Sequence, residues 1–243
     1  MNLKKNDGFT LVEIIIAMGI GLVILAAVYS SVNVSQRSSV SVGKKVTTQQ
    51  DVRSVIDIMA MEIRMASFNP SMSGTIWGTI PSSTTNRHVS PFTPCTNMGL
   101  AAPVINNKGI QIAEPHRLFI AMDLNNPPVK PALIGDANNE YIEYALDNNA
   151  KTITRNVSCG GNNDIPGGED LSSIVRNADS GTPLFQYFDR NNTQLTEPVN
   201  IPDIRRVRIT IVADTKDPDS LSGGVKRMTY TTDVLVKNHV LCP

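Results

Sequence analysis

A single carboxylate lies inside the most apolar stretch of the chain. Glu13 is the only charged side chain between Gly8 and Arg37, and most residues around it are aliphatic. Inserting a carboxylate into a bilayer costs about 3 kcal/mol on insertion scales, so a partner of opposite charge is expected. The stretch contains no cation, which leaves an amino group on another chain or a new amino terminus made by cleavage. Solvation of Glu13 by water and headgroups at the bilayer edge is the alternative.

The apolar stretch that carries Glu13 is long enough to form a membrane-spanning helix. It extends to about Tyr29, and about 20 apolar residues cross the hydrocarbon core. Lys4 and Lys5 precede it, and no basic residue follows before Arg37. Because basic residues favour the cytoplasmic side, the prediction is a single-pass inner-membrane protein with a periplasmic C-terminal domain. A cleaved secretory signal is the alternative, although its cleavage motif would be weak.

These residues resemble the class III signal of type IV pilins and of the pseudopilins of type II secretion. A short basic leader ends in Gly8, Phe9 follows, and Glu13 is the fifth residue after that glycine. The resemblance implies that prepilin peptidase cleaves between Gly8 and Phe9 and that Phe9 becomes the N-methylated first residue. It also implies that Glu13 acts in subunit assembly by neutralising the amino terminus of a neighbouring subunit. Such a pair offsets the desolvation cost of both charges.

The helix that begins in the apolar stretch is predicted to continue well beyond the membrane. No proline occurs between Phe9 and Pro70, and apolar residues recur at helical spacing within 50–66. We therefore expect one helix from Phe9 to about Ser67, with its outer half packed on a domain. A glycine within the Ser- and Val-rich segment Ser38–Gly43 indicates a bend or fraying there.

The rest of the chain shows the period-two alternation of β-strands. Apolar and polar residues alternate in 117–122, 141–146, 206–211 and 228–237. Asp- and Asn-rich turns at 147–150 and 189–192 predict two hairpins. The predicted fold class is therefore α+β and pilin-like. Its long N-terminal α-helix, transmembrane and then amphipathic, packs on a mostly antiparallel β-sheet.

This pattern divides the chain into four parts. Residues 1–8 are the cytoplasmic leader peptide, 9–30 the transmembrane and assembly half of the helix, and 31–68 its amphipathic half. Residues 69–243 form the periplasmic β-rich domain, which opens with a Pro-rich irregular loop over 69–115.

Several later segments resemble the PilW-type minor pilins. They are Ile56–Ala60, Glu62–Ala66, Phe68–Pro70, Tyr141–Tyr144, Thr154–Arg155, Phe185–Asp189, Ile204–Ile209 and Val236–Asn238. The resemblance implies a minor pilin that takes part in initiating type IV pilus assembly. Its partners would be other minor pilins, in a tip or priming complex, and the major pilin. After assembly the protein would be located in the pilus. The alternatives are a minor pseudopilin of type II secretion, whose J-type members share this plan, and a membrane-anchored periplasmic binding domain.

The three cysteines predict one disulfide, because the domain is expected in an oxidising compartment. Cys95 and Cys159 both lie in Pro- and Gly-rich segments that a crosslink would stabilise, so this pair is favoured. Pairing of Cys242 with either one is the alternative. No metal site is expected, since no two cysteines are close in sequence and the three histidines are scattered.

Charge and motifs argue against several other functions. With 22 basic and 22 acidic residues the net charge is zero, so no nucleic-acid partner is expected. The basic cluster Arg205–Arg208 could contact DNA or a neighbouring subunit, but simple solvation is the favoured interpretation. The acidic segment Asp214–Asp219 lacks the glycine and glutamate of a calcium loop and is expected to be a solvated turn. No nucleophile–base pair or phosphate-binding glycine motif is present, so neither an enzyme nor a cofactor is expected.

Overall fold

The computed structural model describes residues 8–68, 70, 109–124, 139–158, 160–166, 171, 173–216 and 224–239. In chain order its elements are α1 (Leu11–Met65), β1 (Ile110–Ala113), β2 (Arg117–Ala121), β3 (Tyr141–Asp147), β4 (Thr152–Val157), β5 (Asn162–Asp164), β6 (Phe185–Phe188), β7 (Gln194–Leu195), η3 (Ile201–Asp203), β8 (Arg206–Asp214), β9 (Arg227–Leu235) and η4 (Lys237–His239). The architecture is one long apolar helix joined to antiparallel sheets, which confirms the predicted α+β pilin-like class.

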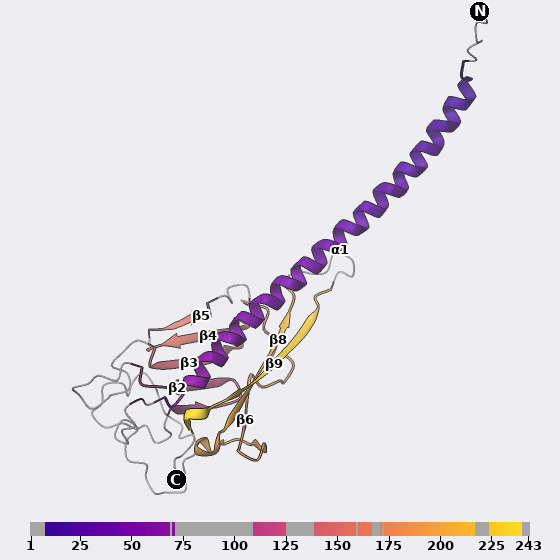
Figure 1. The fold of residues 1–243 in the computed structure, drawn as a ribbon. Helices are drawn as coiled ribbons and strands as arrows, with labels where there is room; N and C mark the ends of the chain where they lie inside the picture. The colour runs from indigo at the N-terminus through magenta and orange to yellow at the C-terminus, as the bar shows by residue number, and fades with distance from the viewer. Residues whose placement is uncertain are drawn as a thin grey trace, which may run out of the picture.

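Helix α1 dominates the molecule and extends far from the rest of it (Figure 1). Its 55 residues correspond to about 80 Å at 1.5 Å per residue. The helix runs unbroken through the segment 38–43, where a bend or fraying was predicted. It ends after Met65, and Ser67 then adopts a left-handed conformation with φ 66°.

The strands form two sheets, where the sequence predicted one. The first is five-stranded in the order β1-β2-β3-β4-β5, and the second is four-stranded in the order β7-β6-β8-β9. Within each sheet neighbouring strands are antiparallel. Strand β1 lies inside the range 69–115, which the sequence predicted to be irregular throughout, so that prediction is wrong for these four residues.

Both predicted hairpins are present and use the expected turn chemistry. In the β3–β4 hairpin, the Asp147 carboxylate accepts hydrogen bonds from the N–H groups of Asn149 and Ala150. In the β6–β7 hairpin, Asp189 accepts in the same way from Asn191 and Thr193. Aspartate carboxylates that bind the following backbone in this way fix tight turns.

The core lies where the last turns of α1 meet both sheets. Four apolar side chains of α1 are fully buried there: Val52, Val55, Met59 and Ile63. They belong to one cluster with inward-facing residues of both sheets, such as Ile120 and Ile209. The C-terminal part of α1 is therefore a core element of the domain, in contrast to the exposed part nearer the N-terminus.

Candidate functional site: the N-terminal segment and its attachment to the domain

The predicted cleavage point lies in exposed, non-helical backbone just before α1. Residues 8–10 precede the helix, and the Phe9 side chain is 81 % exposed. A Cβ placed on Gly8 would have no neighbouring atom within 4 Å, so the peptide between Gly8 and Phe9 is open to an approaching enzyme. The leader residues before Gly8 lie outside the described residues.

Glu13 occupies the first turn of α1. The Thr10 side chain caps the helix by accepting a hydrogen bond from the Glu13 N–H at 3.3 Å. The carboxylate is exposed and has no hydrogen-bond or ion-pair partner among the described residues. An acidic group at this end is favoured by the helix dipole, so the chain alone tolerates Glu13 but leaves its charge available to a partner.

The apolar surface behind Glu13 is completely uncovered. Every residue from Leu11 to Val32 is exposed, and none of the most apolar part of α1 is buried against the domain. Within the described residues, α1 is the one helix long and apolar enough to cross a membrane. Such a large exposed apolar surface is not found on a soluble monomer and requires lipid or other helices as a covering.

The first buried residue of α1 is Thr48. The 37 residues of α1 before it correspond to about 55 Å, while a membrane span takes about 30 Å. About 25 Å of helix is therefore left between the membrane and the first buried turn. This spacer carries Arg37, Lys44 and Lys45.

A buried charge cluster fixes α1 to the first sheet. The Arg155 guanidinium donates two hydrogen bonds to the Glu62 carboxylate, at 2.5 Å to Oε1 and 3.1 Å to Oε2. The Tyr144 hydroxyl donates to the same carboxylate. Burial raises the pKa of Tyr144 strongly, and the Glu62 charge adds to this rise. Glu62 lies among the core positions of an amphipathic helix, and the sequence offered no signal for its partners, which come from strands far along the chain.

A second polar cluster fixes the end of α1 to the C-terminal segment. The Nε2 atom of His239 lies 2.9 Å from the Ile201 carbonyl oxygen, which can only accept, so Nε2 carries the proton. Nδ1 therefore accepts from the Ser67 hydroxyl at 2.8 Å. The Gly109 N–H donates to the same Ser67 oxygen at 3.0 Å. A Cβ on Gly109 would lie 2.0 Å from the Ser67 nitrogen, so this position requires glycine.

The arginines of the predicted basic cluster interact with other residues of the same chain. Arg206 and Arg208 share the outer face of β8, both lie against the Phe188 ring, and both pair with Asp233. The hydrogen bond from Arg208 lowers the pKa of Asp233, as does the charge of Arg206. This arrangement differs from the simple solvation predicted from the sequence.

The acidic segment Asp214–Asp219 also differs at Asp214 from the solvated turn that the sequence predicted. Asp214 is the last residue of β8, is buried, and pairs with Arg227 and Arg176, both at Nε–O distances of 2.8–2.9 Å. The other two acidic residues of that segment, Asp217 and Asp219, lie outside the described residues. So do Cys95, Cys159 and Cys242, so the predicted disulfide stays a prediction.

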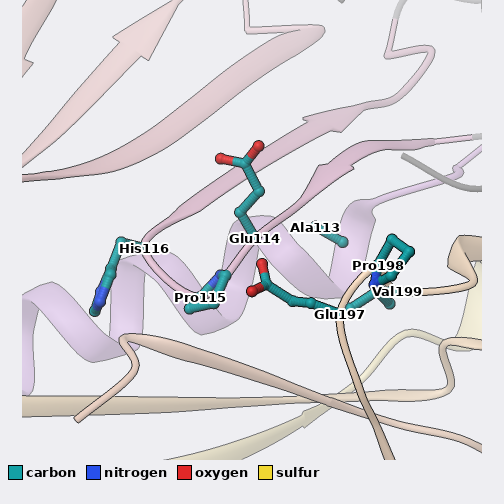
Figure 2. Close-up of a pocket in the computed structure, with 7 residues that line it drawn as sticks. All are labelled: Ala113, Glu114, Pro115, His116, Glu197, Pro198 and Val199. Carbon is teal, nitrogen blue, oxygen red and sulfur yellow. The ribbon is translucent and has the colours of Figure 1, made fainter. Parts of the chain in front are cut away.

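One cleft of about 380 Å³ opens beside the β1–β2 connection (Figure 2). Its lining residues are Ala113, Glu114, Pro115, His116, Glu197, Pro198 and Val199. Figure 2 shows that Glu114, His116 and Glu197 point in different directions instead of toward a common centre. No three His, Cys, Asp or Glu side chains in the described part of the chain are arranged to hold a metal ion.

Comparison with known proteins identifies the N-terminal segment. Residues 3–29 match a family model described as the prokaryotic N-terminal methylation motif. No curated protein and no solved structure matches the chain. The motif implies processing by prepilin peptidase, and with the single apolar helix it fits a single-pass membrane-anchored protein. The chain thus carries a pilin-type N-terminal signal, which supports a relation to the type IV pilin and pseudopilin superfamily.

Proposed function

We propose that this chain is a PilW-type minor pilin that helps to initiate type IV pilus assembly. The observation that carries the proposal is the division of α1 into two halves. The first half is apolar and fully exposed, and the second half is part of the domain core. A helix built in this way transmits the position of its membrane-embedded end directly to the folded domain.

The proposed sequence of events uses the residues of the N-terminal segment. Cleavage after Gly8 frees the amino group of Phe9, which is then methylated. The uncovered apolar surface of α1 packs against the same surface of other subunits. Glu13, which has no partner among the described residues, neutralises the amino terminus of a neighbouring subunit and so sets the axial position of the new subunit.

The role of the β-rich domain in this proposal is to select neighbours within a priming complex. Segments that resemble PilW-type minor pilins fall on β3, β6 and β8, which are central or paired strands of the two sheets. A minor pseudopilin of type II secretion would use the same geometry, and this remains the second candidate. Deleting the gene separates them, because loss of pili with normal secretion supports the minor pilin, and the reverse supports the pseudopilin.

The direct test is the intact mass of the protein purified from its own membranes, together with N-terminal peptide mapping. The expected result is a mature chain that begins at methylated Phe9. A chain that begins after Ala27, or one that retains Met1, would contradict the proposal, because neither presents a free amino group next to Glu13.

A further inference from the structure

The two sheets have four edge strands, and only β9 is long. Strand β5 has three residues and β7 has two, while β1 has four with a register shift between Ile110 and Ile112. Short and bulged edges are common ways of preventing unwanted strand pairing. Strand β9 has nine residues, all paired with β8 in one continuous register.

The backbone of β9 presents unpaired groups along its outer side. The Thr210 N–H donates to the Leu184 carbonyl on the β6 side, so the pair Thr210–Thr231 is one whose backbone groups point away from each other. By alternation, the N–H and C=O groups of every second residue of β9 face away from β8. These residues are Arg227, Thr229, Thr231, Asp233 and Leu235, and none has a backbone partner in the described part of the chain.

Strand β9 also lacks the usual protective residues. It contains no Pro, Gly or Lys. Its two charged side chains are held over the face of the sheet, Arg227 by Asp214 and Asp233 by Arg206 and others. Two exposed apolar side chains flank the edge, Val225 at 52 % and Leu235 at 56 % exposure.

Helix α1 contacts β9 and runs in the same direction (Figure 1). The charge of Arg53 acts on Tyr230 near the start of β9, while the carbonyl of Arg64 accepts from Asn238 just after its end. Strands lie about 4.8 Å apart, so a strand added to β9 would run parallel or antiparallel to α1, one strand spacing beyond β9.

We propose that the open edge of β9 pairs with an extended strand from the globular domain of a different subunit that carries the same type of N-terminal signal. The strand would present polar side chains beside Thr229 and Thr231, which lie on the exposed face of β9. The inference rests on the proposed function, because a subunit packed against the exposed half of α1 would bring its own globular domain alongside β9, which runs in the same direction as α1.

A second copy of this chain does not fit the edge. Two identical edges that pair antiparallel about a two-fold axis reverse the direction of one α1, so the two helices could not enter one membrane with the same orientation. A parallel pairing would place the two α1 helices on opposite faces of the joint sheet, so their exposed apolar halves could not pack against each other as the proposed function requires. The other edges of this chain, β1, β5 and β7, are too short to cover nine residues.

Proline substitutions at two adjacent residues of β9 distinguish the effect of blocking its open edge from the effect of breaking its hydrogen bonds to β8. Thr231→Pro removes an outward N–H, whereas Thr232→Pro removes one that faces β8 opposite Ile209. The full chain in detergent is expected to melt normally with Thr231→Pro and roughly 5 °C or more lower with Thr232→Pro. Thr231→Ala is the matched control, since it loses the same bond to Thr210 but keeps the N–H.

The proposal is tested by photocrosslinking in native membranes. A benzoylphenylalanine at Thr229 is expected to form an adduct with a globular-domain peptide of another signal-bearing subunit. Thr231→Pro should abolish the adduct and Thr231→Ala should preserve it. An adduct with a second copy, an adduct that survives Thr231→Pro, an equal adduct from Gln194 on β7, or no adduct would overturn it. If Thr231→Pro unfolds the domain, the identity of the Thr229 adduct alone decides.

The start of the mature chain is measured in the same cells. Correct cleavage after Gly8 without an adduct rejects only the β9 proposal. An uncleaved chain rejects the proposed function, whatever the adduct.

Discussion

Two glutamates on the same helix are accommodated in opposite ways. Glu62 is buried, and Arg155 and Tyr144 satisfy its carboxylate within the chain. Glu13 is exposed in the apolar half of α1 and has no partner among the described residues. The first carboxylate therefore contributes to the fold of one subunit, and the second is suited to an interaction between subunits.

Glu13→Ala is expected to leave cleavage and membrane insertion intact while it reduces incorporation into sheared filaments at least about tenfold, the equivalent of about 1.4 kcal/mol. The reason is that the amino terminus of the neighbouring subunit loses its counter-charge in a medium of low dielectric constant. Quantitative immunoblots of filament and membrane fractions measure the effect. Thr10→Ser, which retains the capping hydroxyl in the same turn, is the control, and wild-type recovery of Glu13→Ala would rule out this role.

Glu62→Gln is expected to lower the free energy of unfolding by about 2 kcal/mol, because it leaves the half-buried Arg155 without a counter-charge. Urea unfolding followed by circular dichroism measures the loss. Asp57→Asn, an exposed position on the same helix, should change stability by less than about 0.5 kcal/mol. Equal effects of the two substitutions would show that the cluster does not stabilise the joint between α1 and the first sheet.

At the scale of elements, the end of β8 and the start of β9 are joined by the Asp214 carboxylate, which lies between the guanidinium groups of Arg227 and Arg176. The hydrogen bond from Arg227 lowers the pKa of Asp214, and the Arg176 charge lowers it further. An acid whose pKa is lower in the folded state stabilises that state above its unfolded pKa of about 3.9. The contribution is lost as the pH falls through the folded value.

Asp214→Asn should therefore make the free energy of unfolding less dependent on pH at acid pH. The free energy of unfolding of the unmodified chain is expected to decrease as the pH falls below about 4, and that of the variant should decrease less. Urea titrations at a series of pH values measure both curves. Parallel curves would mean that Asp214 does not contribute to acid sensitivity.

The elements that the sequence predicted correctly are those fixed by local signals. Helix α1 follows from apolar periodicity and the absence of proline before Pro70, and the two hairpins follow from Asp147 and Asp189. The cleavage site between Gly8 and Phe9 also rests on a local pattern, and it stays a prediction. The fraying predicted for 38–43 was wrong, because one glycine costs only about 1 kcal/mol and the neighbouring turns continue the hydrogen bonding.

The features that the sequence did not reveal depend on contacts between distant residues. The division into two sheets follows from β6 pairing with β8 instead of extending the first sheet, and alternation alone does not specify a partner. The bond between Ser67 and His239 joins residues 172 positions apart. Each residue alone is an ordinary polar side chain, so no local pattern marks the pair.

At the scale of the whole molecule, the apolar surface and the folded core are separate along the sequence. A chain shortened to begin at Ser30 retains every turn of α1 that contacts the core, which starts at Thr48. It is expected to be a soluble monomer whose unfolding free energy lies within about 1 kcal/mol of the full chain. Sedimentation and urea unfolding measure these properties.

The matched control is a chain that begins at Ile56, which removes the buried Val52 and Val55. Each loss of a buried aliphatic side chain costs about 2 kcal/mol, so this chain should be strongly destabilised. Aggregation of the chain that begins at Ser30 would contradict the separation of surface and core.

The continuity of α1 also determines how the molecule responds to tension. In the proposed filament, a pull would enter the domain along the axis of the helix that fills its core, and β9 lies alongside in the same direction. Sliding the helix out would break the contacts of Val52, Met59, Ile63 and Glu62 together, because they all lie along the direction of force. Loading in shear distributes the work over many contacts at once, so the fold is built to resist extraction along the axis on which retraction would act.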